Sequence, residues 1–262
     1  MADTLADHMD AAQTIRNAVA RVTALRAQTQ ADLHLHSATV AVKKFQALRF
    51  AGTYDDLLGS KEYGSATRFF LEELYSDKDY SLRDAQFARI AGALQTFFPQ
   101  QVVATAVSLA QLHALTEELD HQMALVWTGS SSGTEARDAA SYVRAWNTVG
   151  QSEERKRQLD VVLTVGQELD RLTRTPGLRL MLKMMRRSAL AAGLGSLQTF
   201  LESGFDTFAG MSGKGQRALE FLGIIRARES VWIARLFASD AVTSESALRE
   251  CLGKALLISV EN

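Results

Sequence analysis

The stretch from Pro99 to Val126, PQQVVATAVSLAQLHALTEELDHQMALV, decides the fold class of this chain. Its apolar residues recur every three or four positions, which is the period of an amphipathic α-helix and not the alternation of a β-strand. They are centred on Leu109, Leu112, Leu119 and Met123. Proline fits the first turn of a helix, so Pro99 marks the start. We therefore predict one long helix from Pro99 to about Val126.

The same helical spacing runs through nearly all of the 262 residues. The chain contains 2 prolines, where average usage of about 5% would give roughly a dozen. No segment shows the period-two alternation of Val, Ile and Thr that is typical of a sheet. We predict an all-α, multi-helix bundle of about ten helices. A long N-terminal helix starts with Ile15, Val19, Val22 and Leu25 and is expected to continue past Val40 to Phe45 and Leu48. The others are expected at about 54–58, 65–75, 81–98, 99–126, 135–149, 153–173, 176–191, 196–211, 216–237 and 244–258.

The length and one short glycine-serine stretch bear on the domain organisation. A chain of 262 residues suits one large domain or two small ones. Gly129–Gly133, GSSSG, is the only plausible linker, and Ser132 with Glu135 offers a capping box at the next helix start. We expect a single helical domain over residues 1–262, with a subdivision into two helical halves near 128–134 as the alternative.

Composition excludes several classes of protein. The formal net charge is −1, so no global basic field exists to attract nucleic acid. The single cysteine, Cys251, excludes an internal disulfide and a cysteine-rich metal site. The acidic start MADTLADHMD lacks the pattern of a signal peptide, and no apolar run approaches the roughly 18 residues of a membrane span. We expect a cytoplasmic protein without membrane or nucleic-acid partners, cofactor or metal.

The stretch RFFLEELYSDKDYSLRD, residues 68–84, carries the densest set of aromatic and charged residues. Phe70, Leu71 and Leu74 fall on one face of a helix, whereas Phe69 lies on the opposite side between Glu72 and Glu73. Large exposed aromatic residues are uncommon, which favours a helix that is packed on both sides. The alternative is a cleft or partner groove, flanked by Glu72 and Glu73, that Phe69 enters.

Arg83 and Asp84 follow the loop after this helix. Ser81 and Asp84 are three residues apart, as in a capping box, in which side-chain oxygens accept hydrogen bonds from first-turn amides. The planar fork of Arg83 can pair with Glu72, Glu73 or Asp77 and so hold two helices at a fixed angle. We predict structural roles for both residues.

His113, Glu117 and Asp120 form one stripe, because residues i, i+4 and i+7 lie on the same side of a helix. An imidazole and two carboxylates in such a stripe can contribute to a metal or small-molecule site. The stripe lies on the shoulder of the apolar face, however, and no second copy of the pattern occurs on another helix. A solvated polar shoulder is therefore the favoured interpretation.

Two further charged features stand out in the second half of the chain. Glu229 lies close to the apolar face of its helix, so we expect it in a buried ion pair with Arg226 or a cation from another helix such as Arg186. The second interpretation is an acid that faces a ligand. A basic stripe lies further upstream, and a solvated amphipathic face is its favoured interpretation, with a site for an acidic partner or phosphate groups as the alternative. It consists of Arg179, Lys183, Arg186 and Arg187.

The motif Phe69–Tyr75, FFLEELY, followed by Arg83 and Asp84 and by VVATAVSLAQLHALTEELD, resembles an uncharacterised bacterial family known by its FFLEELY motif. The segments GLGSLQTFLESGF and FLGIIRARESVWIARLF are also similar to that family, so the resemblance covers most of the chain. The family usually has glycine where this chain has Ser76. The resemblance implies a helical, cytoplasmic bacterial protein and no particular reaction.

The residues contain no coherent set for catalysis, so we expect a non-catalytic interaction or regulatory protein with a protein partner or self-association. The expected partner-binding or ligand-binding residues are Phe69, Glu72, Glu73, Arg83, His113, Glu117 and Asp120. The alternative is a small-molecule or metal-binding helical bundle, an enzyme included, in which His113, Glu117 and Asp120 converge with Glu72 and Glu73.

Overall fold

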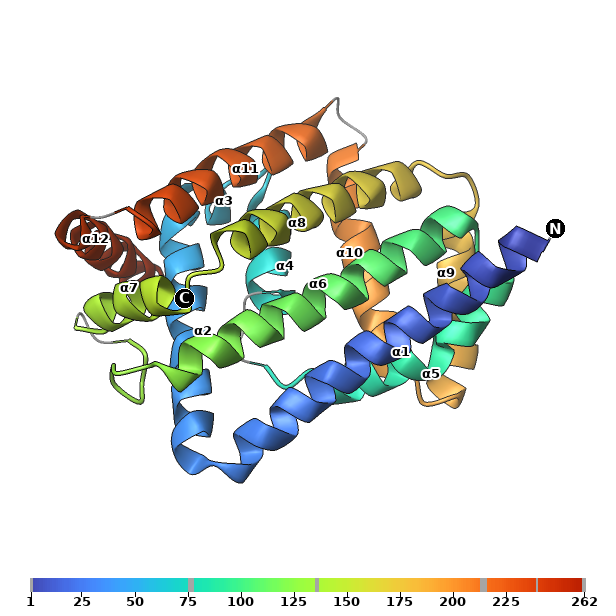
Figure 1. Cartoon of the computed structure of the whole chain (residues 1–262). Helices are drawn as coiled ribbons and strands as arrows, with labels where there is room; N and C mark the ends of the chain where they lie inside the picture. Colours follow the sequence, from blue (N-terminus) through green and yellow to red (C-terminus); the bar gives the residue numbers. More distant parts are fainter. Residues whose placement is uncertain (1, 75–77, 135–136, 213–215, 239, 261–262) are drawn as a thin grey trace. The chain divides into compact units, whose positions relative to one another are not determined.

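The computed structural model describes residues 2–74, 78–134, 137–212, 216–238 and 240–260, which form twelve α-helices and no strand (Figure 1). It is 85% helical, which confirms the all-α prediction. The helices are α1 (Ala2–Ala31), α2 (Leu33–Thr53), α3 (Asp55–Leu58), α4 (Gly64–Glu73), α5 (Ser81–Phe97), α6 (Gln100–Leu125), α7 (Asp138–Val149), α8 (Ser152–Thr173), α9 (Leu178–Ala191), α10 (Gly195–Ser212), α11 (Arg217–Leu236) and α12 (Ala241–Val260).

Helix ends follow local capping chemistry. Pro99 directly precedes α6, as its missing N–H predicts. The predicted N-terminal helix is in fact two helices, α1 and α2, because Asp32 adopts an extended backbone between them. Its carboxylate accepts hydrogen bonds from the amides of His34 (2.8 Å) and Leu35 (3.1 Å), which caps α2. Pro176 lies two residues before α9 and outside its first turn.

The chain forms two compact units, each built from three stretches of sequence. Unit 1 contains Met1–Arg26, Asp79–Glu117 and Val161–Leu219, and unit 2 contains Ala27–Lys78, Glu118–Asp160 and Glu220–Asn262. Four of the boundaries between these stretches fall inside helices, namely α1, α6, α8 and α11. The number of domains, predicted to be one, stays a prediction.

The core of unit 1 is built from α1, α5 and α6. Ile15 and Val22 of α1 meet Leu94 of α5 and a row of alanines on α6, Ala106, Ala110 and Ala114. Small side chains on α6 allow the neighbouring helices to approach closely. Within this unit α10 packs against both α5 and α9, and Figure 1 shows α9 and α10 side by side.

The core of unit 2 contains a cluster of large aromatic side chains. Phe45 of α2 stacks on Tyr142 of α7 with ring centroids 4.4 Å apart, and Trp146 lies 5.7 Å beyond Tyr142. Helix α12 packs against α2 and α7 and adds Leu248 and Leu252 to the same core. All three tryptophans of the chain belong to this unit, namely Trp127, Trp146 and Trp232.

One glycine sets the distance between α2 and α12. A Cβ atom added to Gly52 would lie 1.9 Å from the backbone oxygen of Cys251. No side chain other than hydrogen fits there, because the obstructing atom belongs to the backbone of α12 and cannot rotate away. Gly52 is therefore required for the two helices to pack at this distance.

The glycine-serine stretch is tied to the first turn of α7 inside unit 2. The fully buried Asp138 accepts hydrogen bonds from the amide and from the hydroxyl of Ser130, both at 2.6 Å. Gly133 has φ of +66°, and an added Cβ would lie 2.1 Å from the backbone oxygen of Ala41. The segment is thus a packed loop at its described residues. Glu135, the predicted partner of Ser132 in a capping box, lies outside them.

Candidate functional site

Phe69, for which the sequence allowed either a packed helix or a partner groove, lies on α4 in unit 2 and is 8% exposed. Its ring centroid lies 6.4 Å from that of Phe70, and the Phe70 ring meets the Phe221 ring of α11 edge-on at 5.3 Å. Apolar side chains on both sides of α4 are therefore covered. This arrangement fits the packed helix, which was the first of the two interpretations.

The carboxylates beside Phe69 lie nearer the solvent. Glu72 is exposed, whereas Glu73 is half-buried with its Oε1 3.8 Å from Nζ of Lys78. In unit 1, the guanidinium of Arg83 lies over the rings of Tyr80 (3.9 Å to the centroid) and Phe200 (4.4 Å). Arg83 thus joins α5 to α10 through cation–π contacts. Asp77, one of its predicted partners, lies outside the described residues.

His113 belongs to a charged cluster in unit 1, together with Asp84 and Arg26. The Asp84 carboxylate is buried, and its Oδ2 lies 2.9 Å from Nε2 of His113 and 2.8 Å from Nη2 of Arg26. A carboxylate only accepts hydrogen bonds, so Nε2 of His113 carries the hydrogen and donates it. The cluster ties α1, α5 and α6 together around one buried charge.

The surroundings of Asp84 change its acidity. Burial by itself raises the pKa of this carboxyl, but the hydrogen bond from His113 and the charges of His113 and Arg26 outweigh it, and the pKa lies below its ordinary value. The predicted capping box is wrong, because Asp84 pairs with these two residues. The amide of Ser81 instead donates to Oδ1 of Asp79 at 2.9 Å, immediately before α5.

The replacement Asp84→Asn tests this cluster. We expect a loss of roughly 1–3 kcal/mol in the free energy of unfolding at pH 7, because the buried partners of the carboxylate lose a charged acceptor. A folded-state pKa below the unfolded value of about 3.9 stabilises the protein above that pH, and this contribution disappears as the pH falls through the folded pKa. The difference in the free energy of unfolding between wild type and variant should therefore reach its full size above about pH 5 and shrink below about pH 4. Urea unfolding followed by circular dichroism measures it.

The control for this experiment is Asp206→Asn, which alters a half-exposed carboxylate of unit 1 paired with Arg179. Exposed ion pairs contribute about 0–1 kcal/mol, so its effect should be small at every pH. An Asp84→Asn effect that is equally large at pH 3 and pH 7 would contradict the role given to this charge.

The remaining members of the predicted α6 stripe are buried. In unit 1 Glu117 is 9% exposed, and in unit 2 Oδ1 of Asp120 accepts a hydrogen bond of 3.0 Å from Nε2 of Gln46 on α2. The favoured expectation of a solvated shoulder is therefore wrong for these two carboxylates. Among the described residues, no group of three or more His, Cys, Asp or Glu side chains could hold a metal ion.

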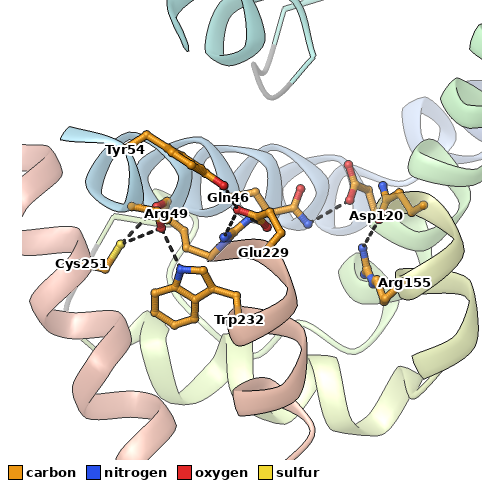
Figure 2. A network of polar contacts seen from close by, with 10 residues as sticks. Gln46, Arg49, Tyr54, Asp120, Arg155, Glu229, Trp232 and Cys251 are labelled. Atoms are coloured by element: carbon orange, nitrogen blue, oxygen red, sulfur yellow. Dashed lines mark hydrogen bonds and ion pairs between the residues drawn. The ribbon is translucent and has the colours of Figure 1, made fainter. Parts of the chain in front are cut away.

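A buried ion pair joins α2 to α11 in unit 2 (Figure 2). Arg49 donates two parallel hydrogen bonds to Glu229, from Nη1 to Oε1 at 3.0 Å and from Nη2 to Oε2 at 2.9 Å. The hydroxyl of Tyr54 donates to Oε1 of the same carboxylate at 3.0 Å. All three residues are buried, and both oxygens of Glu229 are occupied. This carboxylate therefore ties α2 to α11.

The polar network continues from Arg49 toward α12. The indole of Trp232 donates to Oγ1 of Thr53 at 2.9 Å, and the thiol of Cys251 donates to the backbone oxygen of Arg49 at 3.1 Å. Figure 2 shows Arg49, Trp232 and Cys251 converging on this end of α2. Burial raises the pKa of the Cys251 thiol. A buried thiol with a raised pKa is a poor nucleophile, so Cys251 serves packing.

The pairing of Glu229 corrects one detail of the sequence analysis. A buried ion pair was expected and is present, but its cation is Arg49, which is 180 positions away in the chain. The two suggested partners are engaged elsewhere. Arg226 lies 3.1 Å from Asp160 within unit 2, and Arg186 pairs with Glu202 within unit 1.

The basic stripe of α9 divides into an inner and an outer part. On the inner side, Arg179 donates to Oδ1 of Asp206 from Nε (3.0 Å) and Nη2 (2.7 Å), and Nε of Arg186 donates to Oε1 of Glu202 at 3.0 Å. The hydrogen bond from Arg186 holds the pKa of Glu202 below its ordinary value. Both contacts attach α9 to α10.

The outer face of α9 carries large apolar side chains in solvent. Leu180, Met184 and Leu190 are 62%, 66% and 58% exposed. Two exposed cations, Lys183 and Arg187, lie between them on the same side of the helix. We call Leu180, Lys183, Met184, Arg187 and Leu190 together the outer face of α9. The sequence analysis identified these cations but assigned no role to Leu180 or Leu190. The available signal was helical spacing, since Leu180 is four residues from Met184 and Leu190 is three residues from Arg187.

These observations define an all-α protein in which the buried carboxylates of Asp84, Asp120 and Glu229 are held by neighbouring side chains and in which α9 presents an apolar, basic surface. None of the described helices is both long and apolar enough to cross a membrane. The chain belongs to a family described as a domain of unknown function (DUF8198), whose family profile matches residues 25–243. No curated protein and no solved structure matches the chain.

Proposed function

We propose that the chain is a non-catalytic interaction protein that binds a protein partner through the outer face of α9. The exposure of Leu180, Met184 and Leu190 on one side of one helix carries this proposal. Single exposed apolar residues are ordinary, but three large ones along one side of a single helix, with two cations between them, favour an interaction site. Burying an aliphatic side chain contributes roughly 1.5–3 kcal/mol, so three such residues supply a substantial driving force for association.

The attachment of α9 to its own unit supports this role. Among its residues only Ala189 is buried, so the helix gains little from the core. It is held mainly from one side, where Gln198 of α10 donates to the backbone oxygen of Leu182 at 2.8 Å and the two inner arginines pair with α10. A helix that is fixed along one side and apolar on the other presents a preorganised surface to a partner.

The charged groups elsewhere offer less support for a catalytic alternative. His113 and Asp84 are held against Arg26, Asp120 is held by Gln46, and Glu229 is held by Arg49 and Tyr54. The bacterial origin and the FFLEELY family, which come from the resemblance alone, and the cytoplasmic location remain part of this proposal. Glu72 and Glu73 remain candidate partner contacts.

Site-specific cross-linking tests the proposal. A photoreactive amino acid at position 184 of the full chain, expressed in its own cells, should form adducts with one or a few discrete proteins. The matched control is the same amino acid at position 242, because Val242 on α12 is 77% exposed but lies outside the outer face of α9. Leu180→Asp should abolish the adducts at position 184. Equal adducts at both positions, or none at 184, would overturn the proposal.

A further inference from the structure

We infer that the partner segment recognised by the outer face of α9 is an acidic amphipathic helix, an inference that rests on the proposed function. Helix α9 carries four cations, Arg179, Lys183, Arg186 and Arg187, and no carboxylate among its 14 residues. Helix α10 pairs Asp206 with Arg179 and Glu202 with Arg186, and the charge of Lys183 also helps to lower the pKa of Glu202. Four cations against these two carboxylates leave a net positive charge on α9, where Lys183 and Arg187 are exposed, and an acidic segment complements it.

The spacing on α9 matches a helix better than an extended peptide. Leu180 and Met184 are four residues apart and form an apolar row, and Lys183 and Arg187 form a cationic row beside it with the same spacing. From Leu180 to Leu190 the face extends about 15 Å, which is close to three helical turns. A second helix lying along it can place apolar residues at i and i+4 on the apolar row and carboxylates at i+3 and i+7 near the cations.

The side chains also suit a protein partner better than a lipid surface. The side chain of Met184, which is 66% exposed, is unbranched and adapts to differently shaped apolar groups. Helices that lie in a membrane surface usually add aromatic residues to their apolar face, and α9 contains none. Lys183 and Arg187 are two separate cations at fixed positions, which favours a partner with carboxylates at matching positions.

A charge-reversal experiment with synthetic peptides tests this inference on the full chain. The probe is a fluorescent helical peptide of about 18 residues with leucines at i and i+4 and glutamates beside them, and its partner probe has lysine at every glutamate. By fluorescence anisotropy, we expect the glutamate peptide to bind wild type at least 10-fold more tightly than the lysine peptide. Lys183→Glu with Arg187→Glu should reverse this preference, since the side chains concerned are exposed. Raising the salt concentration should weaken the wild-type complex.

Three outcomes would overturn the inference. The first is equal binding of both peptides, or of neither, to wild type. The second is binding to vesicles of anionic lipid that the double substitution abolishes while neither peptide binds. The third is a dimer of the wild-type chain in light scattering that Met184→Asp converts to monomer, which would make a second copy the occupant. If any of these results were found together with adducts at position 184, the proposed function would still hold. Only the inference that the partner segment is an acidic helix would be rejected. Unchanged circular dichroism verifies that the variants fold, and the salt dependence of wild type tests the charge effect independently.

Discussion

Arg49→Met should lower the free energy of unfolding of unit 2 by about 3–5 kcal/mol, the cost of leaving one member of a buried ion pair without its partner. Glu229 would keep a single hydrogen bond of 3.0 Å from Tyr54, which is too little to compensate for a desolvated carboxylate. Urea unfolding followed by tryptophan fluorescence measures the effect in this unit, because all three tryptophans belong to it.

The double variant and a surface control make this result interpretable. Arg49→Met with Glu229→Met removes both charges, so it should recover most of the lost stability. The control is Arg226→Met, because Arg226 also lies on α11 but pairs with Asp160 of α8, and both side chains are more than half exposed. Losing this exposed pair should cost at most about 1 kcal/mol. If Arg49→Met were no more harmful than Arg226→Met, the ion pair would not be the tie between α2 and α11 that its geometry indicates.

Gly52→Ala should destabilise unit 2 by at least about 2 kcal/mol. Overpacking a core typically costs about 1–3 kcal/mol and occasionally more. Helix propensity alone predicts the opposite sign, since alanine in a helix interior is favoured over glycine by about 1 kcal/mol. The contact with the backbone of Cys251 at 1.9 Å decides between the two, because α2 and α12 must move apart to admit a methyl group.

Gly253→Ala is the matched control for this prediction. Gly253 lies on α12, two residues beyond Cys251, and an added Cβ would meet no atom within 4 Å. Helix propensity should therefore act alone there and stabilise the protein by roughly 0.5–1 kcal/mol. Opposite signs for the two substitutions in the midpoint of urea unfolding are the expected result. A stabilising Gly52→Ala would show that the close approach of α2 and α12 is not required.

The fold class could be predicted from the sequence because helical periodicity is a local property. The long helix α6 begins directly after Pro99, as expected from the chemistry of that one residue. The break between α1 and α2 was missed although Asp32 is a good N-cap residue, because the apolar spacing continues across it. A capping residue inside an apparently continuous helical pattern was the signal available there.

The polar partners were harder to predict, because they depend on which helices pack together. A buried Glu229 needs a cation, but Arg49 is 180 positions away and nothing in the local pattern selects it over Arg226. Asp84 satisfied a local capping pattern, yet tertiary packing gave it stronger partners in His113 and Arg26. The exposure of Met184 was equally unpredictable, since a methionine on an amphipathic helix is more often a core residue.

The interleaving of the two units along the chain imposes an order on their assembly during synthesis. Unit 1 has all of its residues once Leu219 has been made, whereas unit 2 also needs Glu220–Asn262, a further 43 residues. At roughly 5–20 residues per second, unit 1 would be complete some 2–9 seconds earlier. During that interval the apolar side chains of α2 lack α12, the helix that Gly52 admits so closely. The newly made chain would therefore depend on the later synthesis of α12 to cover the apolar surface of α2.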